Sequence, residues 1–91
     1  MLVVVSYDVR ETRRRTRLAK ALKDFGERVQ LSVFECRLEE KQIARLRERV
    51  AKLIEPEKDS VRIYRLCGDC APKVELLGVG RITEDAAVIV L

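Results

Sequence analysis

A single carboxylate stands where the first apolar stretch of the chain ends. Residues 1–10 read MLVVVSYDVR, so a largely β-branched run leads into Ser6, Tyr7 and Asp8. Such a run predicts a strand that is buried on both faces. Asp8 then lies where the strand leaves the core, just before an arginine cluster. An acid at this place indicates a site for a charged ligand, and a turn or helix-capping role is the structural alternative.

The residue types of the chain narrow the chemistry that it could perform. The sequence contains no His, which removes the base that a Ser or Cys nucleophile requires. Its glycines are scattered at Gly26, Gly68, Gly78 and Gly80, so there is no glycine-rich phosphate loop. Carboxylate chemistry with a metal ion remains. One carboxylate holds Mg²⁺ poorly, and a two-fold axis passing near Asp8 would supply a second.

A CxxC motif formed by Cys67 and Cys70 is the second candidate for chemistry. Zinc needs four ligands, and within one chain only Cys36 or carboxylates could complete the set. A thioredoxin-like dithiol is expected near a strand–helix junction, whereas this motif falls between two expected strands. The third interpretation is a local turn that a disulfide could close. The odd number of cysteines fits a reducing compartment better than a secreted disulfide framework.

Positive charge is concentrated near the N-terminus. Residues 1–28 hold eight Lys or Arg against four acids, which is the whole net charge of +4. A local excess of this kind favours a polyanion such as a phosphate backbone, and a solvated helix face is the alternative interpretation. No secretory leader is recognisable, and no apolar run approaches the ~18 residues needed to cross a bilayer. We therefore expect a cytoplasmic protein without membrane contact.

Two amphipathic helices are expected to position these charges. Over residues 12–25 apolar residues recur at i, i+3, i+4 and i+7, with Thr12 as the N-cap and Gly26 as the C-terminal stop. Arg14 faces inward in this helix, where a structural ion pair and a phosphate contact weigh about equally. Residues 39–54 repeat the apolar pattern and end before a proline.

The strand pattern leaves one choice of topology open. Apolar alternation changes phase between Leu31 and Val33, so a bulge or a tight turn is expected there. One continuous strand would give a parallel βαβαβ sheet, whereas two strands would give an antiparallel βαββαβ sheet with both helices on one face. Further strands are expected over residues 60–66, 73–80 and 86–91. The last is apolar and uncovered, so we expect it to pair across a dimer interface.

Together these motifs resemble the CRISPR-associated Cas2 family, whose members partner the integrase in spacer acquisition. The resemblance is carried by the strand-end YDV, the Arg-rich helix after it, RVQLSVFEC, a second amphipathic helix and DSVRIYRLC. It implies an α+β, ferredoxin-like βαββαβ sandwich with an additional C-terminal strand, assembled as a homodimer. Residues 1–80 would form the ferredoxin-like core, and residues 81–91 would pack as a strand on the partner subunit.

The resemblance also implies which residues form the site. Asp8 matches a strand-end aspartate that faces its symmetry mate and is associated with Mg²⁺, so it is the expected metal ligand and catalytic residue. Ser32 and Phe34 match the segment that supports this site. Nucleic-acid contacts are expected from arginines of the first helix, namely Arg13, Arg14, Arg15 and Arg17. Arg45 or Arg62 would add to them.

Two roles of the family stay open for this chain. Members are metal-dependent nucleases acting on RNA or double-stranded DNA, and members also serve as non-catalytic bridges that hold DNA for the integrase. Both roles need a basic dimer and both tolerate Asp8. A toxin-like ribonuclease of the same fold, unconnected with CRISPR, is the third alternative. The expected partners are a second copy of the chain, the integrase, and double-stranded DNA or RNA.

Overall fold

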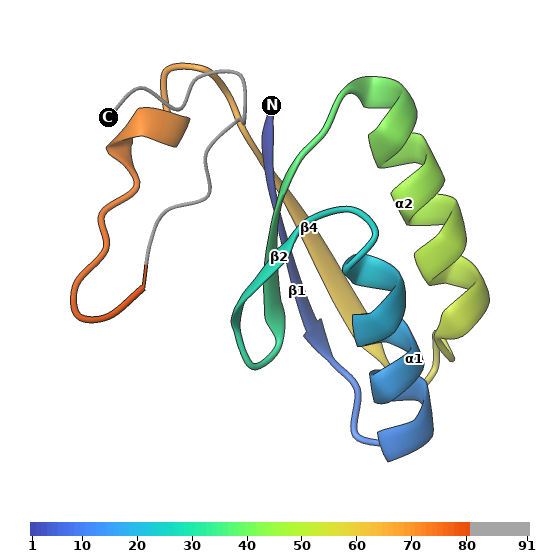
Figure 1. Cartoon of the computed structure of the whole chain (residues 1–91). Coiled ribbons are helices and arrows are strands. Elements are labelled where there is room, and N and C mark those ends of the chain that lie inside the picture. The colour runs from blue at the N-terminus through green and yellow to red at the C-terminus, as the bar shows by residue number, and fades with distance from the viewer. Residues whose placement is uncertain (81–91) are drawn as a thin grey trace.

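A computed structural model describes residues 1–80 of the chain. Its strands and helices follow the predicted βαββαβ order of the ferredoxin-like fold (Figure 1). They are β1 (Leu2–Asp8), α1 (Thr12–Leu22), β2 (Glu27–Gln30), β3 (Val33–Arg37), α2 (Glu40–Leu53) and β4 (Ser60–Leu66), followed by the short 3₁₀ helix η1 (Ala71–Lys73). The strand predicted for residues 86–91 lies outside the described residues.

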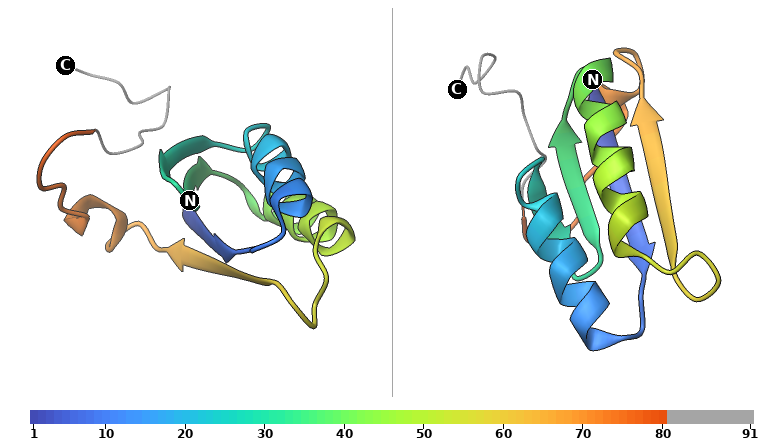
Figure 2. Two further views of the ribbon diagram at one scale, coloured as in Figure 1. Left: turned by 90° about the horizontal axis from the view of Figure 1, so that it is seen from below. Right: turned by 90° about the vertical axis from the view of Figure 1, so that its right-hand side faces the viewer.

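The four strands form one antiparallel sheet in the order β2-β3-β1-β4, so the parallel alternative is wrong. The apolar run of β1 lies in the centre, where Val5 faces Phe34 of β3 and Ile63 of β4. Both helices pack on one face of the sheet, while residues 67–80 extend away on the other side (Figure 1, Figure 2). We call the face without helices the open face.

The phase break between β2 and β3 is a turn combined with a bulge. Leu31 and Ser32 connect the two strands, and the pairing register shifts between Arg28 and Gln30. Both of the expected devices are therefore present at this place. Together they let β3 resume the apolar alternation with Phe34 pointing into the core.

The core lies between the helix-covered face of the sheet and the two helices. The inward positions predicted from helical spacing are confirmed, with Phe25 and Leu53 only half-buried at the ends. The principal buried side chains are Val3, Val5, Tyr7, Leu18, Leu22, Phe34, Cys36, Ile43, Leu46 and Val50. Each large apolar side chain removed from water in this way contributes about 1.5–3 kcal/mol.

The start of α1 differs from the prediction by one residue. Glu11 rather than Thr12 is the N-cap, and its carboxylate accepts hydrogen bonds from the main-chain N–H groups of Arg13 and Arg14. These hydrogen bonds lower the pKa of Glu11. Helix α2 begins with a capping box between Glu39 and Gln42. No helix in residues 1–80 is long and apolar enough to cross a membrane.

Gly26 is not the C-terminal stop of α1, because the helix ends at Leu22 with Lys23 as its C-cap. The glycine instead allows a close approach between the start of β2 and β3. A Cβ atom at this position would lie 2.2 Å from the main-chain oxygen of Glu35 and 2.6 Å from Sγ of Cys36. A side chain therefore has no room there.

The strand predicted over residues 73–80 is absent. Residues 71–73 form η1, and the chain then continues irregularly with Gly78 at φ 93° and Gly80 at φ 127°. These positive φ values are incompatible with an extended strand. The segment lies across a groove from β2, and its Leu77 and Val79 side chains are 92% and 99% exposed.

Candidate functional site

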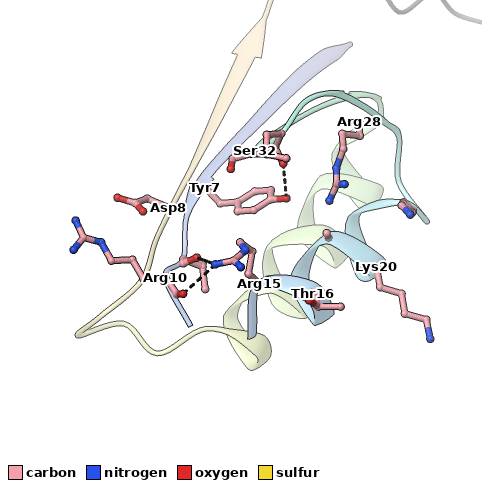
Figure 3. Close-up of a pocket in the computed structure, with 12 residues that line it drawn as sticks. Tyr7, Asp8, Arg10, Arg15, Thr16, Lys20, Arg28 and Ser32 are labelled. Carbon is pink, nitrogen blue, oxygen red and sulfur yellow. Dashed lines mark hydrogen bonds between the residues drawn. The ribbon is translucent and has the colours of Figure 1, made fainter. Parts of the chain in front are cut away.

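Asp8 is the last residue of β1, where it pairs with Ser60 of β4. Successive strand residues point to opposite faces, so its side chain lies on the open face, away from Tyr7. Figure 3 shows the carboxylate pointing away from the Tyr7 ring. Asp8 is exposed and has no hydrogen bond or ion pair with any residue of the described part of the chain. The central strand thus presents one unengaged negative charge.

A depression of about 240 Å³ surrounds Asp8 on the open face. Its polar lining includes Ser6, Ser60, Arg62 and Tyr64. Arg62 Nη1 donates a hydrogen bond to the Tyr64 hydroxyl over 3.4 Å, which raises the pKa of the guanidinium. The structure therefore places Arg62, one of the arginines considered from the sequence, beside Asp8. A cation and hydroxyl groups next to one carboxylate can receive a phosphate together with a metal ion.

A larger pocket of about 1050 Å³ lies on the helix side of the same strand end (Figure 3). We call it the basic pocket, after its five cationic lining residues, Arg10, Arg15, Lys20, Lys23 and Arg28. Tyr7 builds one wall, where its N–H donates to the Ser32 oxygen over 3.1 Å and its hydroxyl to the Leu31 oxygen over 3.3 Å. Asp8 lies at the rim. This concentration of positive charge favours an anionic ligand.

Arg15 fixes the loop between β1 and α1. Its Nη1 atom donates to the main-chain oxygens of Val9 and Arg10 over 3.1 and 3.0 Å, and Nη2 donates to the Thr12 hydroxyl over 3.3 Å. The predicted site residue therefore does lie in the basic pocket. Its hydrogen bonds hold in place the loop that carries Arg10.

Arg14 forms a structural ion pair, one of the two roles considered for it. Its Nε and Nη2 atoms donate to the two carboxylate oxygens of Asp59 over 2.8 and 3.1 Å. The Asp59 side chain is 1% exposed and also accepts a hydrogen bond from the Glu55 N–H over 2.8 Å. The Arg14 guanidinium holds the pKa of Asp59 below its usual range, and Asp59 raises the pKa of Arg14. This fork leaves Arg14 engaged within the fold.

The four arginines expected to bind nucleic acid do not gather at one site. Arg13 is exposed and lines neither the depression nor the basic pocket. Arg17 lines a separate groove of about 400 Å³ between α1 and α2, together with Arg49 and Lys52. Arg45 lies exposed on α2. Of the four, only Arg15 lies at the end of β1, where it holds the loop between β1 and α1.

The two predicted supporting residues have different places. Ser32 lines the basic pocket. Phe34 is fully buried, with its ring centroid 6.3 Å from that of Tyr7 and 5.5 Å from the guanidinium carbon of Arg28. Phe34 therefore supports the pocket wall by packing beneath it and has no surface with which to touch a ligand.

The described residues of one chain do not provide a complete set of ligands for a metal ion. Within residues 1–80 no three His, Cys, Asp or Glu side chains come together in a way that could hold an ion. Asp8 offers one carboxylate, whereas Mg²⁺ is usually held by one or two carboxylates together with waters and phosphate oxygens. One copy of the chain therefore offers Mg²⁺ a single carboxylate at this place, and waters and phosphate oxygens would have to complete its coordination.

The sequence reasoning missed the lysines of the basic pocket. Lys20 and Lys23 follow Thr16 and Ala19 at helical spacing, so these four residues form one stripe along α1 that faces the pocket. This periodicity was available in the sequence. Arg28 reaches the same pocket from β2, and only the sheet pairing reveals its position.

Comparison with known proteins shows a consistent relationship over most of the chain. The family model described as "CRISPR associated protein Cas2" matches residues 1–74. A curated relative from Thermus thermophilus, named CRISPR-associated endonuclease Cas2 2, is 47% identical over 90 residues, covering 99% of this chain and 96% of the relative.

Two solved structures show the same fold. The crystal structure of a hypothetical protein TT1823 from Thermus thermophilus is 47% identical with a TM-score of 0.81, covering 91% of this chain and 96% of that one. A chain in a partial Cas6-RT-Cas1–Cas2 complex is 26% identical with a TM-score of 0.78, covering 99% of this chain and 98% of that one.

Proposed function

Because the chain belongs to the CRISPR-associated Cas2 family, we propose that it acts in spacer acquisition as a homodimer that binds backbone phosphates of duplex nucleic acid alongside the integrase. The observation that carries the proposal is the basic pocket, which places five cations at the end of β1 next to Asp8. Contacts to phosphates give affinity and orientation without reading the base sequence. Such binding is what a protein that handles varied spacers requires.

The comparisons support the choice of ligand and partner. The relative from Thermus thermophilus is named an endonuclease, and a structural neighbour belongs to a complex that contains Cas1. We carry both to this chain as part of the proposal, with nucleic acid as the ligand and the integrase Cas1 as the protein partner.

The proposed dimer forms through the open face. Exposed large apolar side chains lie on this face and on the segment beyond it: Tyr64, Leu76, Leu77 and Val79. Exposed apolar clusters of this kind mark interaction surfaces. In the proposed dimer a two-fold axis passes near Asp8.

Mg²⁺-dependent phosphodiester cleavage is a second candidate function, favoured by the unengaged carboxylate of Asp8. In the proposed dimer the two Asp8 side chains together form the metal site. When bound there, Mg²⁺ would supply a hydroxide nucleophile and neutralise charge on the scissile phosphate. Arg62 in the depression and Arg10 at the rim of the basic pocket would hold and orient that phosphate.

Binding is tested with a charge-matched pair of variants. Arg10→Ala/Lys20→Ala removes two cations of the basic pocket, whereas Lys41→Ala/Arg47→Ala removes two exposed cations of α2. We expect the pocket variant alone to bind a DNA duplex more weakly, with a log–log salt slope shallower by about 2. Fluorescence anisotropy across a salt series measures both. Equal behaviour of the two variants would contradict the pocket as the binding site.

Cleavage and assembly are tested separately. Wild type and Asp8→Asn are compared on duplex DNA and on RNA, with Mg²⁺ and with a chelator. We expect Asp8→Asn to lose metal-dependent cleavage while it still binds the duplex, because the cations remain. A wild type that cleaves neither substrate would remove the nuclease candidate and leave the scaffold role. A monomer at micromolar concentration in sedimentation would contradict both roles.

A further inference from the structure

Two of the three cysteines lie at the ends of a tight turn directly after β4. The Cys70 N–H donates to the Cys67 oxygen over 3.0 Å, and the Ala71 N–H donates to the same oxygen over 2.9 Å. A four-residue turn closed in this way brings its end Cα atoms within about 7 Å. Disulfides span Cα distances of about 4.4–6.8 Å, so the turn holds the two residues near bridging distance.

The two thiols of the turn are exposed and free but chemically unequal. The Cys70 thiol donates a hydrogen bond to the Cys67 sulfur, which is the main cause that lowers the pKa of Cys67. Main-chain N–H groups at Cys70 and Asp69 act in the same direction. The same contact raises the pKa of Cys70. Cys67 is therefore the better source of thiolate, with Cys70 held against its sulfur.

The third cysteine shows what a structural thiol looks like in this fold. Cys36 is fully buried on β3, and desolvation raises the pKa of its thiol to about 11. A protonated, buried thiol is inert toward disulfides. Cys36 can therefore serve as an unreactive internal control when the thiols of this chain are counted.

We propose that Cys67 and Cys70 form a reversible dithiol–disulfide site whose co-reactant is a small-molecule disulfide. The Cys67 thiolate attacks one sulfur of the small disulfide and releases one thiolate, which leaves a mixed disulfide on Cys67. Cys70 then loses its proton, attacks the Cys67 sulfur and releases the second small thiol. The pair gives up two electrons and two protons, and the small disulfide becomes two thiols.

A zinc site is a poorer use of the same residues. Structural zinc takes four ligands, and no third His, Cys, Asp or Glu side chain joins the pair anywhere in residues 1–80. Thiol exchange needs only the two sulfurs that the turn already provides. The exchange site also has a structural consequence, because the bridge would tie the end of β4 to η1 and to the segment that runs beside β2.

Thiol counting tests the proposal. Native wild type, Cys67→Ser and Cys70→Ser are each incubated with excess oxidised glutathione, acid-quenched, unfolded and alkylated for mass spectrometry. We expect wild type to keep one alkylatable thiol, Cys36, and to carry no glutathione, because Cys70 resolves the mixed disulfide. Cys70→Ser should instead accumulate one glutathione on Cys67, and Cys67→Ser should be modified several-fold more slowly. Dithiothreitol should restore all wild-type thiols.

Three results would overturn the proposal. One is a wild type that retains its thiols or accumulates stable glutathione adducts. Another is a disulfide-linked dimer on a non-reducing gel, which would place the bridge between chains. The last is protection of both thiols from alkylation by added Zn²⁺ alone, which would make the turn a metal site. Because both cysteines are exposed, the serine variants should fold, and circular dichroism verifies this.

Discussion

Charged residues of this protein differ in whether another residue of the fold pairs with them. On the helix-covered side, Arg14 is forked on Asp59, and Arg65 at the sheet edge pairs with Glu40 of α2 over 2.8 Å. On the open face, Asp8 has no partner in the described part of the chain. These two ion pairs are therefore neutralised within the fold, whereas the charge at the end of β1 is available to a ligand.

This difference separates residues that stabilise the fold from residues that bind. Arginine is abundant in α1, yet the arginine that faces inward is used to hold the loop before β4. The basic pocket takes its cations from several elements instead, including α1, β2 and the loop after β1. Substitutions of the paired charges and of the unpaired charges should therefore affect stability and binding in opposite proportion.

The largest expected effect comes from the centre of the covered face. Phe34→Ala should lower the free energy of unfolding by about 3–5 kcal/mol, because it removes a fully buried ring and leaves a cavity. Urea denaturation measures the change. Leu31→Ala, at a position that is 84% exposed, is the control and should change stability little. Equal losses in the two variants would contradict the assignment of the core to this face.

A pair of glycines makes the second test. Gly26→Ala should destabilise the protein by about 1–3 kcal/mol, because its Cβ would lie 2.2 Å from the Glu35 oxygen. Gly68→Ala is the matched control, since nothing lies within 4 Å of its Cβ. Thermal unfolding distinguishes them. A neutral Gly26→Ala would mean that β2 and β3 approach less closely than the structure shows.

The ion pair of the covered face should give a smaller, pH-dependent effect. The folded-state pKa of Asp59 is lowered, so its contribution to stability is complete above the unfolded aspartate pKa of about 3.9 and is lost as pH falls through the folded value. Asp59→Asn should thus be less stable than wild type at neutral pH and approach it in acid. Urea midpoints measured across pH 2–7 test this, and a gap that stays constant would contradict the pairing.

The smallest effect on stability is expected at Asp8. Asp8→Asn removes no hydrogen bond or ion pair among the described residues, so its unfolding midpoint should match that of wild type at neutral pH. Parallel measurement with Asp59→Asn makes the comparison direct, because the two substitutions are chemically identical. A loss as large as that of Asp59→Asn would show that Asp8 serves the fold rather than a ligand.

The amino-acid sequence predicted most elements of the fold, because periodicity is a local property. The i, i+3, i+4 pattern located both helices, and the phase break at Leu31 to Val33 located the turn. Prediction failed at residues 73–80, where an apolar composition suggested a strand. Gly78 and Gly80 adopt positive φ values in the structure, and composition alone does not report backbone conformation.

The features of the candidate site also separate into those that local sequence predicts and those that depend on contacts between distant residues. Asp8 was predicted to lie at a strand end beside positive charge, because the apolar run before it and the arginines after it are adjacent in the sequence. The structure places it there. The partners of individual arginines could not be predicted. Asp59 reaches Arg14 across 45 positions of sequence, and Arg28 reaches the pocket through the pairing of β2 with β3.

The sequence by itself therefore determined the two helices, the strands of the four-stranded sheet, the excess of positive charge and the acid at the end of β1. These depend on neighbouring residues and on their spacing along the chain. Only the tertiary structure decided which arginine is held inside the fold and which cations surround the basic pocket. Those outcomes depend on contacts between segments that only folding brings together.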